Sequence, residues 1–563
     1  MEEYRKRYER WLSSEAVDEA TKEELRAIAS DEKEIQERFY KDLEFGTAGL
    51  RGVIEAGANR MNVYTVRRAT QGLANYFLLQ DPLAREKGVA IAYDSRHQSD
   101  VFARETAAVF NGNGIKAYVF ESLRPTPELS YAVRKLGCKG GVVITASHNP
   151  SKYNGYKAYW EDGCQVPPPV DGEIIGEVMK VDIFDGVRVM PRAQAEQAGL
   201  YVEIGEDVDS AYTAEVKKHL IDPESLKECA GDLKIVYTPL HGTGNKLVRR
   251  VLSECGFRQV YVVPEQELPD GDFPTVPYPN PEDVRALELA RQLGEKVDAD
   301  LIVGTDPDAD RVGIMVKTPE GYRPFTGNMT GMLLTHYILD ARKKTGTLPP
   351  DGFIVKSIVT TEMVRPMAEE YGVELRDVLT GFKYIGQQIL RSEQSGKGTY
   401  LFGFEESYGY LCGTYARDKD AVSASLLICE MAAICKAQGV SLIDHLEELY
   451  QKYGYYKEAV VSMAFEGIEG AAKMKEIMEQ MRSNPRDSYA GLKVLEVEDY
   501  LTGYKDYPKS DALRIRLENN CWVCVRPSGT EPKIKFYFGA NGKTAAQADG
   551  INERLKQEMT AGM

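Results

Sequence analysis

The sequence predicts an α/β protein built from several domains, with an α+β domain at its C-terminal end. The chain has 563 residues, and single hydrophobic cores stop growing at roughly 250–300 residues. Apolar strand-like runs alternate with helical stretches, which is typical of mostly parallel sheets covered by helices. This alternating series of strands and helices starts again twice along the chain, and it ends near residue 450. We therefore expect three mixed α/β domains of related topology before the α+β domain.

The first domain is expected to begin with short helices on its outside. Residues 1–40 are rich in Glu, Lys and Arg, and Trp11, Leu12 and Leu25 are spaced among them in an amphipathic pattern. A βαβαβ series follows, in which Ser99 or Asp100 is the expected N-cap of the first helix. The members of the series are "GVAIAYDS" (88–95), "SDVFARETAAVFNGNG" (99–114), "IKAYVF" (115–120), "PELSYAVRKLG" (127–137) and "GVVIT" (141–145).

Two further α/β units and a different last unit complete the chain. The second unit includes "LKIVYTPLHGTG" (233–244) and "DLIVGTDPDADRVGIMV" (300–316), and the third ends with "GTYLFGFEESYG" (398–409). The last unit has two strands around a loop, "CWVCVRPSGTEPKIKFYFG" (521–539), and then a charged helix. The predicted domains are 1–205, 206–320, 321–450 and 451–563.

The composition of the chain limits the kinds of binding partner and the cellular compartment that we expect for this protein. A net charge of −16 and a pI of about 5.2 argue against a broad nucleic-acid or anionic-membrane surface. No signal peptide or membrane span is expected, because the longest apolar stretch, 421–437, contains Glu430 and is typical of a buried helix. Nine scattered cysteines predict free thiols in a reducing cytoplasm. Cys521 and Cys524 form a lone CxxC in an apolar strand, so we expect them to pack in a core.

Four polar loops each follow a strand-like run, where ligands collect in open α/β sheets. The first, "TASHNP" (145–150), places Ser147 beside His148. The serine is either a nucleophile activated by a base or metal, or a residue that caps the turn. Adjacency alone does not make His148 its base. Lys157, ten residues on, is either an acid/base and phosphate contact or a surface charge.

The second loop, "GTDPDADR" (304–311), predicts a magnesium site. Asp306, Asp308 and Asp310 alternate between two apolar strands. Carboxylates this close repel one another unless a cation neutralises them, and Mg²⁺ prefers such hard oxygen ligands. The loop is not an EF-hand, because Arg311 stands at position six and Lys317 at position twelve.

The third and fourth loops suggest sugar and phosphate contacts. In "GFEESYG" (403–409), Glu405 and Ser407 could bind sugar hydroxyls, although an ordinary polar turn explains them equally well. In "RPSGTEPKIKFY" (526–537), a guanidinium, two hydroxyls and a flexible backbone favour phosphate over a plain turn. The residues concerned are Arg526, Ser528, Gly529 and Thr530. Together the four loops fit phosphoryl transfer on a phosphosugar.

The four motifs, in this order, resemble the α-D-phosphohexomutase superfamily, which contains phosphoglucomutases and phosphomannomutases. Supporting matches are "FGTAGLRG" (45–52), "YDSR" (93–96), "TPLHGTG" (238–244) and "TGFKYIG" (380–386). The N-terminal helical segment and the aromatic forms of two motifs look most like the phosphoglucomutase-2-type branch, which includes phosphopentomutases. The loop "GFEESYG" (403–409) differs from the phosphomannomutase-type loop, which lacks the Phe and the second aromatic residue. This difference disfavours mannose as the main sugar of the substrate. Pro307 and Ala309 replace glycines of many relatives but leave the three carboxylates.

The resemblance implies four domains around a central cleft and a role for each motif. Ser147 would carry a phosphoryl group, His148 would stand beside it, and Lys157 would be the acid/base. Mg²⁺ would be held by Asp306, Asp308, Asp310 and an oxygen of phosphorylated Ser147. The resemblance also implies a set of substrate contacts: Arg51, Ser95, Arg96 and Arg311 near the reacting phosphate; Thr380, Gly381 and Lys383 in a specificity loop; Glu405 and Ser407 on the sugar; and Arg526, Ser528, Gly529 and Thr530 on the other phosphate.

The expected function is interconversion of glucose 1-phosphate and glucose 6-phosphate in the cytoplasm. It would proceed through phosphorylated Ser147 and a sugar bisphosphate, with glucose 1,6-bisphosphate as activator. No nucleic acid or membrane partner is expected. The alternatives are a phosphopentomutase or phosphomannomutase, a glucose-1,6-bisphosphate synthase, a phosphatase, and a non-catalytic regulator on the same fold. An intact serine and triad disfavour the regulator.

Overall fold

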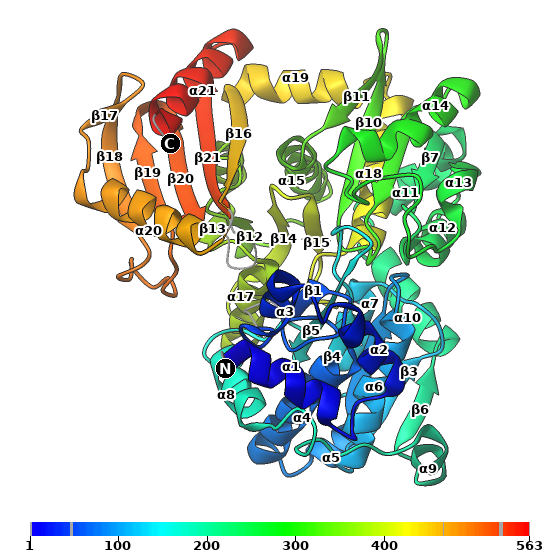
Figure 1. Ribbon diagram of the computed structural model, residues 1–563. Helices are drawn as coiled ribbons and strands as arrows, with labels where there is room; N and C mark the ends of the chain where they lie inside the picture. The colour runs from blue at the N-terminus through cyan, green and yellow to red at the C-terminus, as the bar shows by residue number, and fades with distance from the viewer. Residues whose placement is uncertain (1–2, 45–48, 466, 528–532, 562–563) are drawn as a thin grey trace.

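A computed structural model describes residues 3–44, 49–465, 467–527 and 533–561 of the chain (Figure 1). Four sheets follow one another along the sequence, and each belongs to a separate domain. The first three combine parallel and antiparallel strands with flanking helices, and the fourth is antiparallel throughout. The expected fold class, three related α/β domains and a C-terminal α+β domain, is confirmed. The domain boundaries stay predictions; the second sheet runs on to Phe325.

The first sheet has the strand order β1-β5-β4-β2-β3-β6. Strands β4, β2, β3 and β6 are parallel, and β5 and β1 complete the sheet as antiparallel neighbours. The elements of this part are α1 (Glu3–Ser13), α2 (Glu19–Ala27), α3 (Glu32–Phe39), β1 (Leu50–Val53), α4 (Val63–Gln80), α5 (Ala84–Lys87), β2 (Val89–Tyr93), α6 (Ser99–Gly112), β3 (Ala117–Phe120), α7 (Thr126–Lys135), β4 (Gly140–Ile144), β5 (Tyr153–Trp160), α8 (Val170–Lys180), α9 (Arg192–Gln197) and β6 (Tyr201–Ile204).

The second sheet has the order β11-β10-β9-β7-β8, and the third has the order β13-β12-β14-β15. Their elements are α10 (Glu206–Lys217), α11 (Pro223–Cys229), β7 (Lys234–Thr238), α12 (Gly244–Glu254), β8 (Gln259–Val262), α13 (Pro264–Glu267), α14 (Glu288–Val297), β9 (Leu301–Thr305), β10 (Val312–Thr318), β11 (Gly321–Phe325), α15 (Gly327–Lys344), β12 (Gly352–Ser357), α16 (Val364–Tyr371), β13 (Glu374–Val378), α17 (Phe382–Ser395), β14 (Thr399–Glu405), β15 (Gly409–Cys412), α18 (Ala421–Ala437) and α19 (Leu442–Tyr453).

The fourth sheet has the order β16-β21-β20-β19-β18-β17. The expected strand pair and closing helix are β20, β21 and α21, and four further strands and α20 join them. The elements are β16 (Tyr455–Ala464), α20 (Gly467–Ser483), β17 (Ser488–Tyr489), β18 (Leu492–Asp499), β19 (Leu513–Leu517), β20 (Trp522–Pro527), β21 (Lys533–Gly542) and α21 (Ala545–Thr560), with single 3₁₀ turns at Ala230–Asp232, Val284–Leu287 and Glu518–Asn520.

The first three sheets share one feature that decides where the polar loops lie. In each, one parallel strand is followed directly by an antiparallel partner: β4 by β5, β9 by β10, and β14 by β15. The connections are the loops at 145–152, 306–311 and 406–408. Equivalent topology therefore places three of the four predicted loops at equivalent ends of their sheets.

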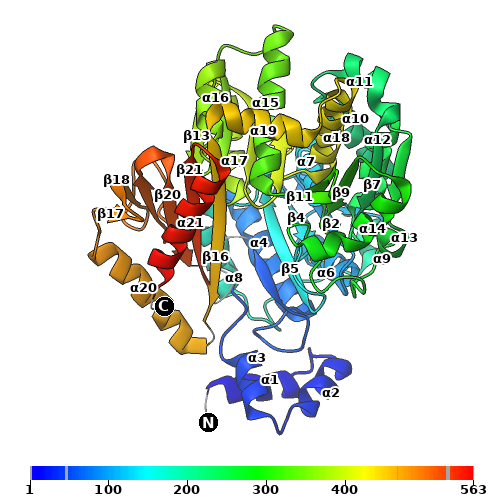
Figure 2. The same cartoon turned by 90° about the horizontal axis from the view of Figure 1, so that it is seen from above.

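Helices α1–α3 pack on the outside of the first domain, as expected (Figure 2). Tyr8, Trp11 and Phe39 form a small aromatic core with Tyr64 of α4. The expected cap of α6 is wrong. Gln98, in a left-handed conformation, precedes the helix without a side-chain cap, and the Ser99 hydroxyl donates to Asp94 instead, at 2.7 Å.

Helix α18 is buried along almost its whole length, which confirms the expected core helix. Among the described helices none is by itself long and apolar enough to cross a membrane; α18 and α19 reach that length only as a pair bent by 90°. All nine cysteines are free thiols. Cys521 and Cys524 lie in cores of the fourth domain, as expected, and burial raises the pKa of Cys524 to about 12.

The segment between β15 and α18 joins the first three domains. Residues 413–420 follow the third sheet and reach back to the first two domains. Asp418 accepts a hydrogen bond from Tyr159 of β5 at 2.6 Å, and Asp420 accepts one from Tyr212 of α10 at 2.8 Å. Arg417, directly before them, is fully buried. Buried polar contacts of this kind fix the relative positions of the elements that they join.

A pair of histidines joins α15 to α19, the helix that leads into the fourth domain. Nε2 of His445 lies 3.1 Å from Nδ1 of His336. Burial, together with the neighbouring His445, lowers the pKa of His336 to about 4. Both rings are therefore neutral at pH 7, and one donates to the other.

Protonation of this pair should weaken the fold at acid pH. An unfolded chain protonates His336 near its ordinary value of 6.5, whereas the folded chain does so only near 4. Its contribution to the free energy of unfolding is present above 6.5 and falls by up to about 3 kcal/mol as the pH drops to 4. Denaturant unfolding between these pH values measures this. We expect His336→Gln to flatten the pH dependence; an unchanged slope would exclude the pair as its source.

Candidate active site

The loops after β4 and β9 meet at a single hydrogen bond. Oγ of Ser147 donates to Oδ2 of Asp306 at 2.9 Å, although 159 residues separate them in sequence. Both side chains are buried, at 4% and 0% exposure. The structure therefore brings the predicted serine to the predicted metal ligands.

Ser147 has a strained backbone conformation that hydrogen bonds from neighbouring residues stabilise. Its φ is 52°, a conformation unusual for a residue with a Cβ, and its N–H donates to Oγ1 of Thr145 at 2.8 Å. The Arg96 guanidinium donates to the carbonyl oxygens of Ser147 at 2.6 Å and of Pro150 at 2.9 Å. Arg96 was expected near the reacting phosphate, but its Nη1 and Nη2 atoms donate hydrogen bonds to backbone carbonyls of the serine loop. We propose that it positions this loop.

The three aspartates are buried and crowded. One oxygen from each lies within 4.8 Å of the others, close enough to share a metal ion. Burial, and then the charges of Asp308 and Asp310, raise the pKa of Asp306 well above its ordinary value. Oδ1 of Asp308 and Oδ1 of Asp310 are buried and find no hydrogen-bond partner among the described residues. Buried acceptors without donors are costly, so these oxygens fit a cation.

Two lysines flank the triad. Nζ of Lys157 lies 2.8 Å from Oδ2 of Asp308, and Nζ of Lys419 lies 3.2 Å from Oδ2 of Asp310. Burial disfavours the charged form of Lys157, but Asp308 and Asp310 outweigh it and raise its pKa. For Asp310, burial opposes ionisation, yet Lys419, Lys157 and Arg311 hold its pKa below the ordinary value. Lys157 is therefore a protonated residue of the site and no surface charge.

Lys419 and Thr126 are site residues that the sequence reasoning missed. Thr126, at the start of α7, donates to Oδ2 of Asp308 at 2.9 Å. Lys419 lies in "ARDKDA", directly before the buried helix α18. A cluster of charges at the edge of an apolar helix is the signal that could have indicated Lys419. Thr126 carries no such signal.

His148 lies against the serine, and Arg311 bridges two loops. Nδ1 of His148 is 3.1 Å from Oγ of Ser147. Burial, followed by the charges of Arg311 and Arg51, lowers the pKa of His148 well below its ordinary value, so the ring is neutral. Nη1 of Arg311 donates to the carbonyl of Ser407 at 3.1 Å and to Glu282 at 2.7 Å. Arg311 thereby links the metal loop to the predicted sugar loop.

The predicted sugar and specificity loops also lie together. Oε1 of Glu405 accepts the N–H of Gly381 at 2.7 Å. Burial, followed by the charge of Glu406, raises the pKa of Glu405 to about 7. Lys383 is buried, and its Nζ lies 3.5 Å from Asp171 of α8. Ser95 is half-buried and its hydroxyl has no partner among the described residues.

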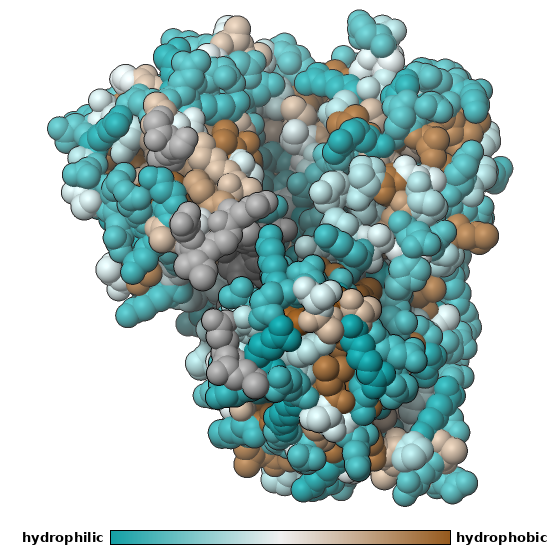
Figure 3. All heavy atoms as spheres, in the orientation of Figure 1, coloured by the Kyte–Doolittle hydropathy of each residue, from teal (hydrophilic) through white to brown (hydrophobic). Residues whose placement is uncertain are grey.

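The fourth domain reaches this group through Arg526, whose Nη1 donates to Oγ1 of Thr380. Ser528, Gly529 and Thr530 lie outside the described residues, so their predicted phosphate contacts are not placed. Seen as spheres, the molecule is hollowed between the fourth domain and the second and third domains (Figure 3). Arg526 and Thr380 contact each other across the boundary between the third and fourth domains.

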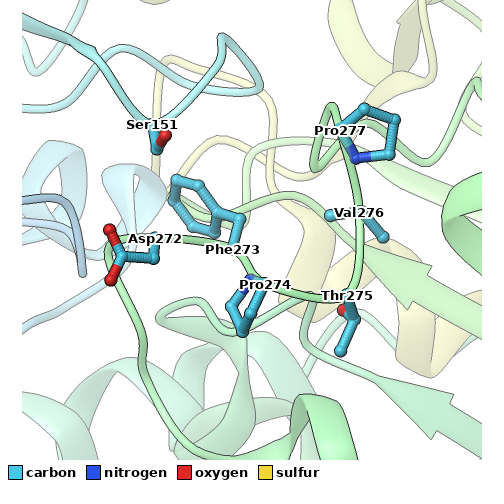
Figure 4. A pocket seen from close by; sticks show the side chains of 7 residues that line it. All are labelled: Ser151, Asp272, Phe273, Pro274, Thr275, Val276 and Pro277. Atoms are coloured by element: carbon cyan, nitrogen blue, oxygen red, sulfur yellow. The ribbon is translucent and has the colours of Figure 1, made fainter.

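A segment of the second domain closes one side of the serine loop. Figure 4 shows a pocket of about 430 Å³ in which Ser151 faces Phe273. The Phe273 ring also stacks on Arg96, with the guanidinium 5.0 Å from its centroid, and Asp272 pairs with His97 at 2.7 Å. The loop at 270–277 thus covers the guanidinium that holds the serine.

Comparison with known proteins gives the same assignment for every domain. The phosphoglucomutase/phosphomannomutase α/β/α domains I, II and III match residues 42–183, 210–321 and 326–453, and the family's C-terminal domain matches 464–557. The chain belongs to the phosphoglucomutase/phosphomannomutase family. The resemblance to the α-D-phosphohexomutases inferred from the motifs is thereby confirmed.

Relatives in this family are similar over nearly their whole length. A phosphoglucomutase of Staphylococcus epidermidis is 39% identical over 520 residues, which cover 90% of this chain and 92% of that protein. One from Staphylococcus saprophyticus is 36% identical, with 93% and 94% covered. The open form of pp63/parafusin, a phosphoglucomutase from Paramecium, has the same fold, with a TM-score of 0.71, 18% identity, and 92% and 95% covered.

Binding of a divalent cation to the triad should stabilise the folded protein. A ligand that binds only the folded state at 100 times its Kd contributes about 2.7 kcal/mol. We expect MgCl₂ to raise the midpoint of thermal unfolding relative to EDTA, and Asp308→Asn to abolish most of this rise. Asp298→Asn, which removes an acid paired with Lys317 at the end of α14, is the matched control. Equal rises in all three proteins would place the cation elsewhere.

Proposed function

We propose that this protein is a phosphoglucomutase that interconverts glucose 1-phosphate and glucose 6-phosphate through phosphorylated Ser147. The observation that carries the proposal is the hydrogen bond from Oγ of Ser147 to Asp306, within the buried triad. This contact places Oγ of Ser147 where a phosphoryl group on it would lie beside a cation held by the three carboxylates. The Staphylococcus relatives, named phosphoglucomutases, support the same activity.

Asp306, Asp308 and Asp310 would hold Mg²⁺, with a phosphoryl oxygen on Ser147 as a further ligand. When bound, the ion supplies positive charge that neutralises the oxygens of the transferring group. This assignment rests on the buried carboxylate oxygens of Asp308 and Asp310 that have no hydrogen-bond partner among the described residues and that a cation would satisfy. Glucose 1,6-bisphosphate is proposed as intermediate and as the compound that restores a lost phosphoryl group.

The transfer moves one phosphoryl group between two oxygens. The P–O bond to Oγ of Ser147 breaks, a P–O bond to the free sugar hydroxyl forms, and the proton of that hydroxyl ends on Oγ, so that the proton and the phosphoryl group exchange places. Protonated Lys157 is the acid beside the reacting groups. When the other phosphate returns to Ser147, the neutral His148 ring, 3.1 Å away, can accept the serine proton.

The sugar and its second phosphate would be held by the other two loops. Glu405, Ser407 and the segment at 380–383 offer acceptors and donors for the sugar hydroxyls. Arg526 with Ser528, Gly529 and Thr530 would hold the phosphate that is not reacting, and Arg51 and Arg311 the one that is. The site for the phosphate that is not reacting must accept either end of the sugar in turn. This fits the position of its loop on a separate domain. The acidic protein is proposed to act in the cytoplasm, where its free thiols persist.

Replacing the serine tests the reaction directly. We expect Ser147→Ala to lower kcat by at least about a thousandfold, because no covalent phosphoryl carrier remains. Its intact mass should also lack the single phosphoryl group that a fraction of the wild-type protein carries. Ser151→Ala, in the same loop but without a contact to the triad, is the control. Full mutase activity in Ser147→Ala would refute the mechanism.

The preferred sugar is tested by competition. With MgCl₂ and a trace of glucose 1,6-bisphosphate, we expect kcat/KM to be highest for glucose 1-phosphate among glucose, mannose and ribose 1-phosphates. We expect this because the chain is similar over nearly its whole length to proteins named phosphoglucomutases, and because Glu405 and the segment at 380–383 lie together and offer hydrogen-bond groups for sugar hydroxyls. A higher kcat/KM for ribose 1-phosphate would identify a phosphopentomutase instead.

A further inference from the structure

The loop at 270–277 of the second domain packs against the part of the first domain that supports the serine loop. The Phe273 ring covers the Arg96 guanidinium, whose carbon lies 5.0 Å from the ring centroid, and both side chains are buried. The backbones are also close, because a Cβ on Gly271 would come within 2.8 Å of the backbone nitrogen of His97. The two domains therefore meet tightly at the guanidinium.

The covered guanidinium holds four backbone carbonyls. Nη1 of Arg96 donates to the carbonyl oxygens of Pro150 at 2.9 Å and Tyr153 at 3.1 Å. Nη2 donates to that of Ser147 at 2.6 Å and to that of Asn149. Since these donors point outward in the plane of the guanidinium, its face is left for an aromatic ring. The φ of 52° at Ser147 is a strained conformation that persists only where the surroundings hold it.

Hydrogen bonds to two buried side chains anchor the loop at 270–277 in the second domain. Oγ1 of Thr275 lies 2.9 Å from Nε2 of His241 and accepts a hydrogen bond from Nε2 of Gln266 at 3.0 Å. Nδ1 of His241 lies 3.2 Å from the carbonyl oxygen of Leu268, so Nδ1 carries the proton and Nε2 accepts from the Thr275 hydroxyl. Burial lowers the pKa of His241, which keeps the ring in this neutral form.

The metal loop is held by the same turn, which connects β7 to α12 and contains His241. A Cβ on Gly242 would come within 2.4 Å of Cα of Pro307, and the N–H of Thr243 donates to the carbonyl of Pro307 at 2.8 Å. The turn thus contacts the metal loop and also anchors the loop at 270–277. A continuous set of contacts therefore runs from the metal ligands to the serine loop.

We propose that Phe273 is a positioning residue for Ser147, which it holds at the metal triad by fixing the Arg96 guanidinium. The ring places an aromatic face on a desolvated cation, where such contacts are strongest. Without the ring, the guanidinium and the carbonyls that it binds shift into the space that is left. A displacement of about 1 Å in a reacting group costs roughly a hundredfold in rate. The importance of this positioning rests on the proposed function of Ser147.

Replacing the ring by an aliphatic side chain tests the proposal in two ways. We expect Phe273→Leu to increase amide hydrogen exchange in residues 145–150 by about threefold or more, measured by mass spectrometry. We also expect it to lower kcat for glucose 1-phosphate by roughly 10- to 100-fold and to change KM by less than about twofold, because other domains hold the sugar. Phe273→Tyr should keep slow exchange and most of kcat, since the pocket of about 430 Å³ beside the ring can take its hydroxyl.

Val276→Ala is the matched control. Val276 belongs to the same small core as Phe273, with Leu240 and Ala286, but an aliphatic side chain cannot form the contact with a cation. The control should lower the free energy of unfolding, because it removes buried methyl groups, and should leave exchange in 145–150 and kcat unchanged. Equal losses of kcat in Val276→Ala and Phe273→Leu would show that the ring acts through stability alone, and would overturn the proposal.

A second variant keeps the test decisive if Phe273→Leu does not fold. Thr275→Val keeps the ring but removes the hydroxyl that anchors the loop, so it should also increase exchange in residues 145–150 and lower kcat. Unchanged exchange in both variants, or faster exchange with unchanged kcat, would overturn the proposal. The exchange measurement does not depend on the reaction. Full activity of Ser147→Ala would refute the proposed function, whereas the effect of the ring on the serine loop would still be measured.

Discussion

Three buried carboxylates within 4.8 Å of one another are the constraint on which the rest of this structure depends. Like charges in a buried site repel strongly unless cations or protons compensate them. Lys157 from the first domain and Lys419 from the third supply two positive charges, and Ser147 and Thr126 donate hydrogen bonds. The triad thereby ties three domains to one point. A divalent cation held by the triad would complete the compensation.

The repeated topology explains why these groups can meet. In each of the first three sheets, a parallel strand turns directly into an antiparallel neighbour, and the turn carries the reactive polar residues. Three copies of one arrangement carry Ser147, the three aspartates and the loop at 406–408. The fourth domain has a different, antiparallel sheet. It is attached through α19, the contact between Arg526 and Thr380, the buried ion pair of Arg514 with Glu362, and a hydrophobic cluster shared with the third domain.

Positioning in this site depends on residues that do not contact the reacting atoms. Arg96 fixes the carbonyls of the serine loop, and Phe273 of the second domain covers Arg96. The segment at 413–419 holds Lys419 beside Asp310, and its Asp418 accepts a hydrogen bond from Tyr159 of the first domain.

The sequence by itself determined the order and type of most elements, the buried character of α18 and the four polar loops. Local periodicity and the chemistry of short motifs carry that information, because hydrophobic spacing follows the repeat of each helix or strand. It also determined the metal triad, whose members are close in sequence. Only the tertiary structure decided that Lys157 is buried against Asp308, that Arg96 holds backbone carbonyls, and that Lys419 and Thr126 join the site. These contacts join residues more than 50 positions apart, and no local pattern encodes them, since they arise from how the domains pack.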